Sequence, residues 1–344
     1  MSDIHAANKQ AMQPLRAALY DLDAATLPKT LQQVFAADAA IQLATPLETM
    51  LGPDALYEQA YQPLIHAIPD LERRDYILMA GPAADQDANW VGCAGNYVGV
   101  FERPWLDIPP TGHVVGMRYH EFFRIEEGKI VEMQALWDIP QVMMQARAWP
   151  MTPSLGVDWL APAPATQDGI ITAPRDDEHS AFSLQLVGDM LRDLGKSSEG
   201  PEAMQLDKRW HPKMLWYGPA GIGTNRRVQG FRNWHQIPFL RGMPDRVGDP
   251  AAGYFFADND YVGFTAWPGM HMTISGDGWL GIPPLHRRIT MRSLDFWRVE
   301  GDWIRENWVL VDLLHVYNQL GVDVFSRMRE IGRASCRERV FPVV

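Results

Sequence analysis

Residues 105–138 read WLDIPPTGHVVGMRYHEFFRIEEGKIVEMQALWD, and residues 279–312 read WLGIPPLHRRITMRSLDFWRVEGDWIRENWVLVD. The two stretches align without a gap at an offset of 174 residues (279 minus 105), and about 14 of the 34 positions are identical. The identities include both prolines of the IPP turn and the pair Arg118/Arg292. Chance does not produce a match of this length. The chain therefore carries two copies of one domain, and any functional site should be sought twice.

The composition narrows the class of protein. Of the 344 residues, 47% are hydrophobic, so each copy can bury a core. The formal net charge of -11 argues against nucleic acid or an anionic membrane as a partner. The first residues lack the apolar run of a signal peptide, and no apolar run approaches a membrane span. The two cysteines exclude a disulfide framework or a zinc cluster, so we expect a cytoplasmic protein without a metal or another cofactor.

The repeat also predicts the domain boundaries. We expect the first domain at residues 1–148, a proline-rich linker at residues 149–177 and the second domain at residues 178–330. Residues 331–344 are rich in arginine and have no counterpart in the first copy. We interpret them as a non-native tail, with a disordered native tail as the alternative.

Each copy shows helical patterns first and strand patterns afterwards, which is an α+β order. A sheet that curves around its helices would form one pocket in each copy. In the first copy, the periodicity predicts helices around residues 15–22, 31–35 and 54–66, then strands at residues 73–79 and 89–101 and the repeated hairpin. In the second copy it predicts helices at residues 180–194 and around 231–237, strands at residues 253–257, 260–267 and 270–275, the hairpin, and a final helix at residues 313–329.

The repeated hairpin places one acid in a largely apolar row. Alternate residues of its outgoing strand point to one face, and in the first copy that face carries Glu121 between Tyr119 and Phe123. The second copy has Asp295 at the same place, beside Trp297. The opposite face carries mostly polar residues: Arg118, His120, Phe122 and Arg124.

The register of the hairpin decides what these acids meet. A three-residue loop puts Ala135 opposite Glu121, and it also places Met133 and Trp137 on the acid's face. A two-residue loop would put Gln134 opposite Glu121, so we prefer the longer loop, which gives one face a consistent apolar character. The same count puts Val309 opposite Asp295. We expect the following residues to line the two pockets and bind a ligand: Tyr119, Phe123, Met133 and Trp137 in the first copy, and Trp297 and Asn307 in the second.

A carboxyl group in an apolar pocket holds its charge only at high cost. Desolvation raises its pKa, so that near neutral pH it can donate a proton or a hydrogen bond. This makes Glu121 and Asp295 the candidate catalytic residues. The alternative is that each acid reaches solvent at a strand edge or pairs with a buried arginine.

The hairpin closely resembles that of the SnoaL-like polyketide cyclases. The resemblance rests on MRxxEFFRIEEGKIVEMQALWD and MRSLDFWRVEGDWIRENWVLVD, on the preceding IPP turns and on the Gln-Leu-Gly at 319–321, and it spans roughly residues 12–148 and 178–329. It implies the cone-shaped α+β fold of the nuclear transport factor 2 superfamily, which includes ketosteroid isomerase. Each copy would then be a curved, mainly antiparallel sheet with helices in its concave side. Because this scaffold hosts many functions, the resemblance indicates the fold more specifically than the chemistry.

The catalytic residues of these families carry over only in part. Glu121 and Asp295 match the isomerase's oxyanion-hole acid, which an apolar site keeps neutral, and Tyr20 lies near the place of its oxyanion tyrosine. The cyclases' catalytic aspartate falls on Ala135 and Val309, which are inert. The isomerase's base also has no acidic counterpart, because its position falls near Ala44 or Thr45 and near Gly218. Other candidate bases are His66, His113 and Glu48, while Asp138 and Asp312 are expected to cap helices.

Three functions follow as hypotheses. The first is an enzyme that uses acid–base chemistry on a small, mostly apolar carbonyl compound, such as a cyclase or an isomerase. The second is a binding protein for apolar ligands, since the usual base is missing. The third is a scaffold in which the second copy completes the first. Single domains of this superfamily often pair through their sheets, so we expect either a pseudo-twofold monomer or a homodimer.

Overall fold

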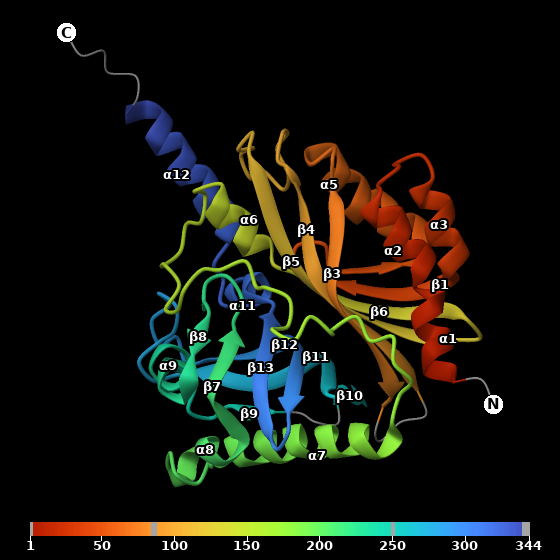
Figure 1. The fold of residues 1–344 in the computed structure, drawn as a ribbon. Helices are drawn as coiled ribbons and strands as arrows, with labels where there is room; N and C mark the ends of the chain where they lie inside the picture. Colours follow the sequence, from red (N-terminus) through yellow and green to blue (C-terminus); the bar gives the residue numbers. More distant parts are fainter. Residues whose placement is uncertain (1–2, 84–87, 249–251, 339–344) are drawn as a thin grey trace.

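The computed structural model describes residues 3–83, 88–248 and 252–338, and in it each copy of the repeat forms one α+β unit. Each unit has a mixed sheet with helices against one of its faces, as the sequence predicts. The helices α1, α2 and α3 lie on the side of the first sheet that faces away from the second copy (Figure 1). The helix α7 lies on the side of the second sheet that faces away from the first copy. Within the described residues, no helix is long and apolar enough to cross a membrane.

The first sheet has the strand order β2-β1-β6-β5-β4-β3. The strands β1 and β6 run parallel, and the other neighbours run antiparallel. The sequence patterns missed β1, because Phe35 was assigned to the preceding helix. The strands are β1 (Phe35–Leu43), β2 (Thr49–Leu51), β3 (Glu72–Pro82), β4 (Asn89–Val100), β5 (Val114–Glu126) and β6 (Lys129–Trp137).

The helices of the first copy bury apolar stripes against this sheet. Leu15 and Leu19 are four residues apart, as are Leu27 and Leu31, and all four side chains are fully buried. The predicted third helix is a continuous run with a wider π-helical turn in its middle. The helices are α1 (Ile4–Ala11), α2 (Gln13–Tyr20), α3 (Leu27–Val34), α4 (Gly52–Leu56), the π turn η1 (Tyr57–Tyr61), α5 (Gln62–Ala67) and, after the sheet, α6 (Ile139–Gln145).

The second copy repeats this plan. Its sheet has the order β10-β11-β12-β13-β7-β8, and β9 pairs with β11. The strands are β7 (Trp210–Tyr217), β8 (Asn225–Arg226), β9 (Val247–Gly248), β10 (Gly253–Asp258), β11 (Tyr261–Ile274), β12 (Arg287–Glu300) and β13 (Trp303–Val311). The helices are α7 (Asp177–Leu194), the 3-10 turn η2 (Ser197–Glu199), α8 (Leu206–Arg209), α9 (Arg227–Phe231), the π turn η3 (Arg232–Gln236), α10 (Ile237–Gly242), α11 (Leu313–Gln319) and α12 (Val324–Glu338).

Two predictions for the second copy need correction. The strands expected at residues 260–267 and 270–275 are one strand, β11, with a register shift between Ala266 and Met270. The final helix expected at residues 313–329 is two helices, because Gly321 adopts a positive φ of 78° and ends the first of them. The second, α12, continues to Glu338, into the segment interpreted as a tail. Residues 339–344 of that segment lie outside the described residues.

The register of the hairpin is confirmed, although its loop is different. Glu121 pairs with Ala135, and Asp295 pairs with Val309, as predicted. The turn itself is short, because Glu126 already pairs with Lys129. A bulge at Val131 then shifts the register by one residue and restores the predicted pairing. The second hairpin has the same shift after Arg298/Glu306.

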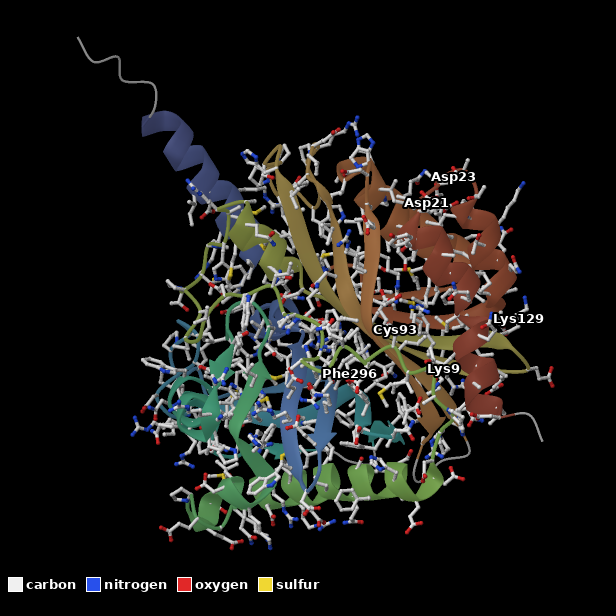
Figure 2. All side chains as sticks on the ribbon, viewed as in Figure 1. Lys9, Asp21, Asp23, Cys93, Lys129 and Phe296 are labelled. Atoms are coloured by element: carbon white, nitrogen blue, oxygen red, sulfur yellow. The ribbon has the colours of Figure 1, made fainter. Side chains whose placement is uncertain are left out.

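Each sheet has one face that is turned away from its own helices. These two faces pack against each other with approximate twofold symmetry. Phe122 stacks on its counterpart Phe296 with ring centroids 4.7 Å apart, and Figure 2 labels Phe296 where the two copies meet. His120 bonds through Nδ1 to the carbonyl oxygen of Leu294, at 2.7 Å. His120 therefore lies on the face away from the helices, as predicted. The face that looked polar in the sequence is a second buried core between the copies.

Two aspartates join the copies reciprocally. The Oδ2 atom of Asp312 accepts a hydrogen bond from the backbone N–H of Thr45 at 2.9 Å. The Oδ2 atom of Asp138 accepts one from the backbone N–H of Ala220, the counterpart of Thr45, at 3.0 Å. Asp312 also caps α11 by accepting from His315, whereas the side chain of Asp138 makes no such cap. The predicted capping role thus holds for Asp312, and both side chains bridge the copies.

The proline-rich segment between the copies lies against both sheets. Ile170 forms a bridge with Leu78 of β3, and Val157 forms one with Thr224. Ala161 is buried, and the carbonyl oxygen of Pro162 accepts a hydrogen bond from the indole of Trp308 at 3.0 Å. This segment therefore contacts both copies at several points, although it forms only isolated bridges between α6 and α7.

Candidate functional site

Glu121, the predicted acid of the first copy, is fully buried and fully partnered. Its Oε1 atom accepts hydrogen bonds from the hydroxyl of Tyr97 and the indole of Trp137, both at 2.9 Å. Its Oε2 atom forms an ion pair with Nη1 of Arg73 at 2.5 Å, and neither side chain is exposed. Of the two alternatives left open by the sequence, the buried arginine partner is the one found here.

The arginine that pairs with Glu121 belongs to a wider network. Arg73 also contacts Asp75, whose carboxylate accepts from Tyr119 and Arg16 at 2.7 Å each. Burial alone would lower the pKa of Arg73, but Asp75 and Glu121 raise it well above its usual value. The guanidinium lies 4.4 Å from the centre of the Tyr119 ring. This network and its aromatic rings are buried where the sequence predicted a pocket.

Asp295, the acid of the second copy, has no such partner. Its Oδ2 atom accepts a hydrogen bond from Ser293 at 3.1 Å. Its Oδ1 atom is buried and has no hydrogen-bond partner among the described residues. Burial raises the pKa of Asp295 to about 8, even though the Ser293 hydroxyl and the charge of Arg118 act in the opposite direction. The carboxyl group is therefore mostly neutral at pH 7.

The difference between the two acids follows from one position in the neighbouring strands. Arg73 on β3 and Met117 on β5 pair with the same residue of β4, the strand between them. Met291 on β12 is the counterpart of Met117. In the same way, Gly248 on β9 and Met291 pair with one residue of β11, the strand between them. The second copy thus has a glycine where the first has the arginine that neutralises Glu121. Without that side chain, space remains beside Asp295.

This open space is a cavity of about 140 Å³ between the second sheet and its helices. Its walls are mostly apolar, which explains the desolvation of Asp295. The lining includes Asp295, Trp210, Trp216, Trp297, His235 and Arg246. A cavity with apolar walls and a few polar groups, one of them with a perturbed pKa, is the usual form of a small-molecule site.

His235 brings a second titratable group to the cavity. Its ring stacks on Trp216 with centroids 4.1 Å apart, and its Nδ1 atom is buried without a partner among the described residues. Burial, together with the charge of Arg246, lowers the pKa of His235 to about 3, so the imidazole is neutral at pH 7. Its counterpart in the first copy is Ala60, one residue before the end of the equivalent π turn.

Sequence reasoning missed His235 because it chose the wrong face of this helix. The helix predicted around residues 231–237 rests on the apolar spacing of Phe231, Trp234 and Ile237, yet Trp234 is 54% exposed. The π turn η3 contains a wider ring of hydrogen bonds, so the phase of an ordinary helix fails across it. The spacing Phe231, His235, Phe239 was the signal that could have identified the residue, since these rings lie in contact.

The other predicted site residues fall into three groups. Tyr119, Phe123, Met133 and Trp137 are buried in the filled first copy. Trp297 and Asn307 line the cavity of the second copy. Tyr20 is 62% exposed at the end of α2, so its expected place beside Glu121 is wrong.

The predicted base candidates lie away from the cavity. His66 and His113 are exposed on the first copy. Glu48 pairs with Arg292 at 2.7 Å, and its pKa is lowered because hydrogen bonds from Arg292 and Thr45 outweigh the effect of burial. Within the described residues, no group of three His, Cys, Asp or Glu side chains could hold a metal ion. Cys93 is buried, and burial raises the pKa of its thiol to about 12.

Comparisons with known proteins agree with the duplicated fold. A family model described as SnoaL-like polyketide cyclase matches residues 14–146 and 203–320, one segment in each copy. IdmH from Streptomyces antibioticus, proposed to be a polyketide cyclase, has 18% identity and a TM-score of 0.34, covering 40% of this chain and 96% of that one. An NTF2-like protein from Burkholderia thailandensis has 20% identity and a TM-score of 0.32, covering 41% and 96%. No curated protein sequence matches the chain.

Proposed function

Because the chain belongs to the SnoaL-like polyketide cyclase family, we propose that its second copy is a cofactor-independent enzyme acting on a small, mostly apolar carbonyl compound. The reaction is of the cyclase or isomerase type and passes through an enolate that Asp295 stabilises. The observation that carries this proposal is the Oδ1 atom of Asp295, which is buried beside an apolar cavity and has no partner among the described residues. The first copy serves as a structural partner.

The chemistry assigned to Asp295 follows from its protonation state. With a pKa of about 8, the carboxyl group carries its proton at neutral pH. It donates a hydrogen bond to the carbonyl oxygen of the ligand, and this bond strengthens as negative charge develops on that oxygen. The apolar walls of the cavity increase the strength of the interaction, because they exclude water. A donor of this kind accelerates reactions by about 10²–10³-fold.

His235 is the candidate proton acceptor. It lines the same cavity, it is neutral at pH 7, and its Nδ1 atom has no partner among the described residues. A base with a pKa of about 3 takes a proton from carbon only weakly, because general-base catalysis works best with a pKa near the operating pH. We therefore assign most of the rate acceleration to Asp295 and a smaller share to His235.

Exchange of α-hydrogens tests this proposal without knowledge of the natural substrate. The probe is 2-tetralone, an apolar ketone with acidic α-hydrogens, incubated in D₂O and followed by mass spectrometry. The protein should speed deuterium uptake above the buffer rate, and Asp295→Asn should reduce the protein-dependent rate by about 10²-fold. His235→Ala should reduce it less.

The matched control is Asp302→Asn, the same substitution at the exposed turn of the same hairpin. It should leave the exchange rate unchanged. If the Asp295→Asn variant stays folded and exchanges 2-tetralone as fast as the unmodified protein, Asp295 does not stabilise an enolate.

A second candidate function is ligand binding without catalysis. The low pKa of His235 favours it, because a weak base limits proton transfer. In that case 2-tetralone would bind in the cavity, seen by calorimetry, while its α-hydrogens would exchange at the buffer rate. Protein-dependent exchange that is lost in Asp295→Asn would exclude this second function.

A further inference from the structure

Two tryptophans that line the cavity of the second copy carry N–H groups with no acceptor among the described residues. The Nε1 atoms of Trp210 and Trp297 are buried and have no hydrogen-bond partner among the described residues. Both side chains line the cavity that contains Asp295. Buried indoles without a partner among the described residues also occur at Trp90, Trp105 and Trp279, but these three do not line it. The pair Trp210 and Trp297 is therefore distinguished by its location.

The first copy shows what a cavity-filling role would require at these positions. Trp210 occupies the place of Phe35, since both pair with the matching isoleucine of the neighbouring strand. Trp297 occupies the place of Phe123. In the first copy, the two phenylalanine rings pack edge to face with centroids 6.4 Å apart. The fold thus accommodates phenylalanine at both positions in the first copy, and tryptophan at these positions adds two hydrogen-bond donors to the second copy.

An indole N–H can only donate, and a buried donor without an acceptor is unfavourable. We propose that Trp210 and Trp297 determine the ligand specificity of this cavity by donating hydrogen bonds to oxygen atoms of the ligand. The ligand is then an apolar ring compound with several acceptor oxygens, such as a dione, in preference to the hydrocarbon of the same shape. This inference rests on the proposed function only for the location of the ligand, and it does not require turnover.

A matched pair of probes isolates the role of the oxygens. The first is 2,2-dimethylindane-1,3-dione, a rigid diketone that cannot form an enol, and the second is 2,2-dimethylindane, which has the same frame without oxygen. Binding is measured by titration calorimetry. The unmodified protein should bind the dione at least tenfold more tightly than the hydrocarbon. Trp210→Phe and Trp297→Phe, which install the residues of the first copy, should each weaken dione binding about tenfold and change hydrocarbon binding less than twofold.

Trp234→Phe is the control, because Trp234 is exposed in the same copy. It should change neither affinity. A second readout uses protein labelled with ¹⁵N-tryptophan, in which the indole signals of Trp210 and Trp297 are assigned by their loss in the two variants. The dione should shift both signals downfield, as expected for new hydrogen bonds, and the hydrocarbon should not.

The outcomes separate this inference from the proposed function. Equal affinity for the two probes, or a loss of affinity for both probes in the phenylalanine variants, would show that the indoles contribute shape alone and would overturn the inference. The proposed function would survive that result, because it depends on Asp295 and on α-hydrogen exchange. Failure of both probes to bind would refute the cavity as a ligand site and would remove both proposals.

Discussion

Glu121 and Asp295 occupy the same position in the two copies, yet only Glu121 meets an arginine. Arg73 pairs with Glu121 at 2.5 Å, whereas Gly248 stands at the matching place in the second copy. One carboxyl group is thereby held in an ion pair inside a filled core. The Oδ1 atom of the other lies beside a cavity and has no partner within the described part of the chain. The two copies thus contain one acid in an ion pair and one acid that lines a cavity.

This contrast predicts opposite effects of amide substitution on stability. Glu121→Gln removes the negative charge from a buried ion pair. The positive charge of Arg73 is then balanced by Asp75 alone. We expect the free energy of unfolding to fall by about 3 kcal/mol, measured by urea denaturation at pH 7. A loss below about 1 kcal/mol would mean that the ion pair adds little to the fold.

Asp295→Asn should instead stabilise the protein as the pH rises. The folded protein holds the Asp295 proton up to a pH of about 8, while the unfolded chain releases it near pH 4. Between these values the folded state binds more protons, so the stability of the unmodified protein falls as the pH increases. The variant has no carboxyl group at this position, so its stability does not fall for this reason. Its free energy of unfolding, relative to that of the unmodified protein, should rise by roughly 2–5 kcal/mol between pH 5 and pH 9. Urea denaturation at both pH values measures the difference, and a constant offset would contradict it.

Gly248→Arg should convert the second site toward the first. A Cβ atom at Gly248 meets nothing within 4 Å among the described residues, so the first carbon of a new side chain fits there. A guanidinium near Asp295 favours the ionised carboxyl and lowers its pKa. We expect loss of 2-tetralone exchange in the D₂O assay, with the overall fold unchanged by circular dichroism. Gly248→Gln, similar in length but uncharged, is the control and should retain more of the activity.

The reciprocal bridges between the copies predict a shared contribution to stability. Asp138→Ala removes the acceptor of the Ala220 N–H, and Asp312→Ala removes the acceptor of the Thr45 N–H. Each buried donor then lacks its partner, and Arg118 or Arg292 loses a nearby charge. We expect each variant to lose about 2–4 kcal/mol of unfolding free energy. Two separate unfolding transitions, one unchanged by each substitution, would show that the copies unfold independently.

The packing between the copies also predicts the oligomeric state. Phe122, Phe296 and their neighbours bury the outer faces of both sheets against each other. Because these faces are already covered, we expect a monomer of 38.9 kDa in light scattering. A stable species of twice that mass would indicate a further interface elsewhere on the surface.

Much of the fold could be predicted from the sequence because the hairpin is duplicated. A face that must stay apolar fixes its register, and Glu121/Ala135 and Asp295/Val309 pair as expected. The strand β1 was missed because Phe35 continues the apolar spacing of the preceding helix. The loop length was also wrong, since a short turn followed by a bulge gives the same register as a longer loop.

The site was harder to predict because it depends on contacts between distant strands. The hairpin identified both acids, but only the ladders from Met117 to Arg73 and from Met291 to Gly248 distinguish them. His235 was hidden by the π turn, which changes the face that a helix presents. Trp210 and Trp297 stand out as candidate ligand-binding residues only when they are compared with Phe35 and Phe123. That comparison requires the register of both sheets.

Titration of Asp295 by ¹³C NMR tests the central claim most directly. The side-chain carboxyl carbons of aspartate are labelled, and the Asp295 signal is assigned by its loss in Asp295→Asn. Because the carboxyl group is desolvated and no described residue places a cation at Oδ1, its signal should titrate with a midpoint near pH 8. A midpoint near pH 4, the usual value for an aspartate, would mean that Asp295 is ionised at neutral pH and would contradict the account.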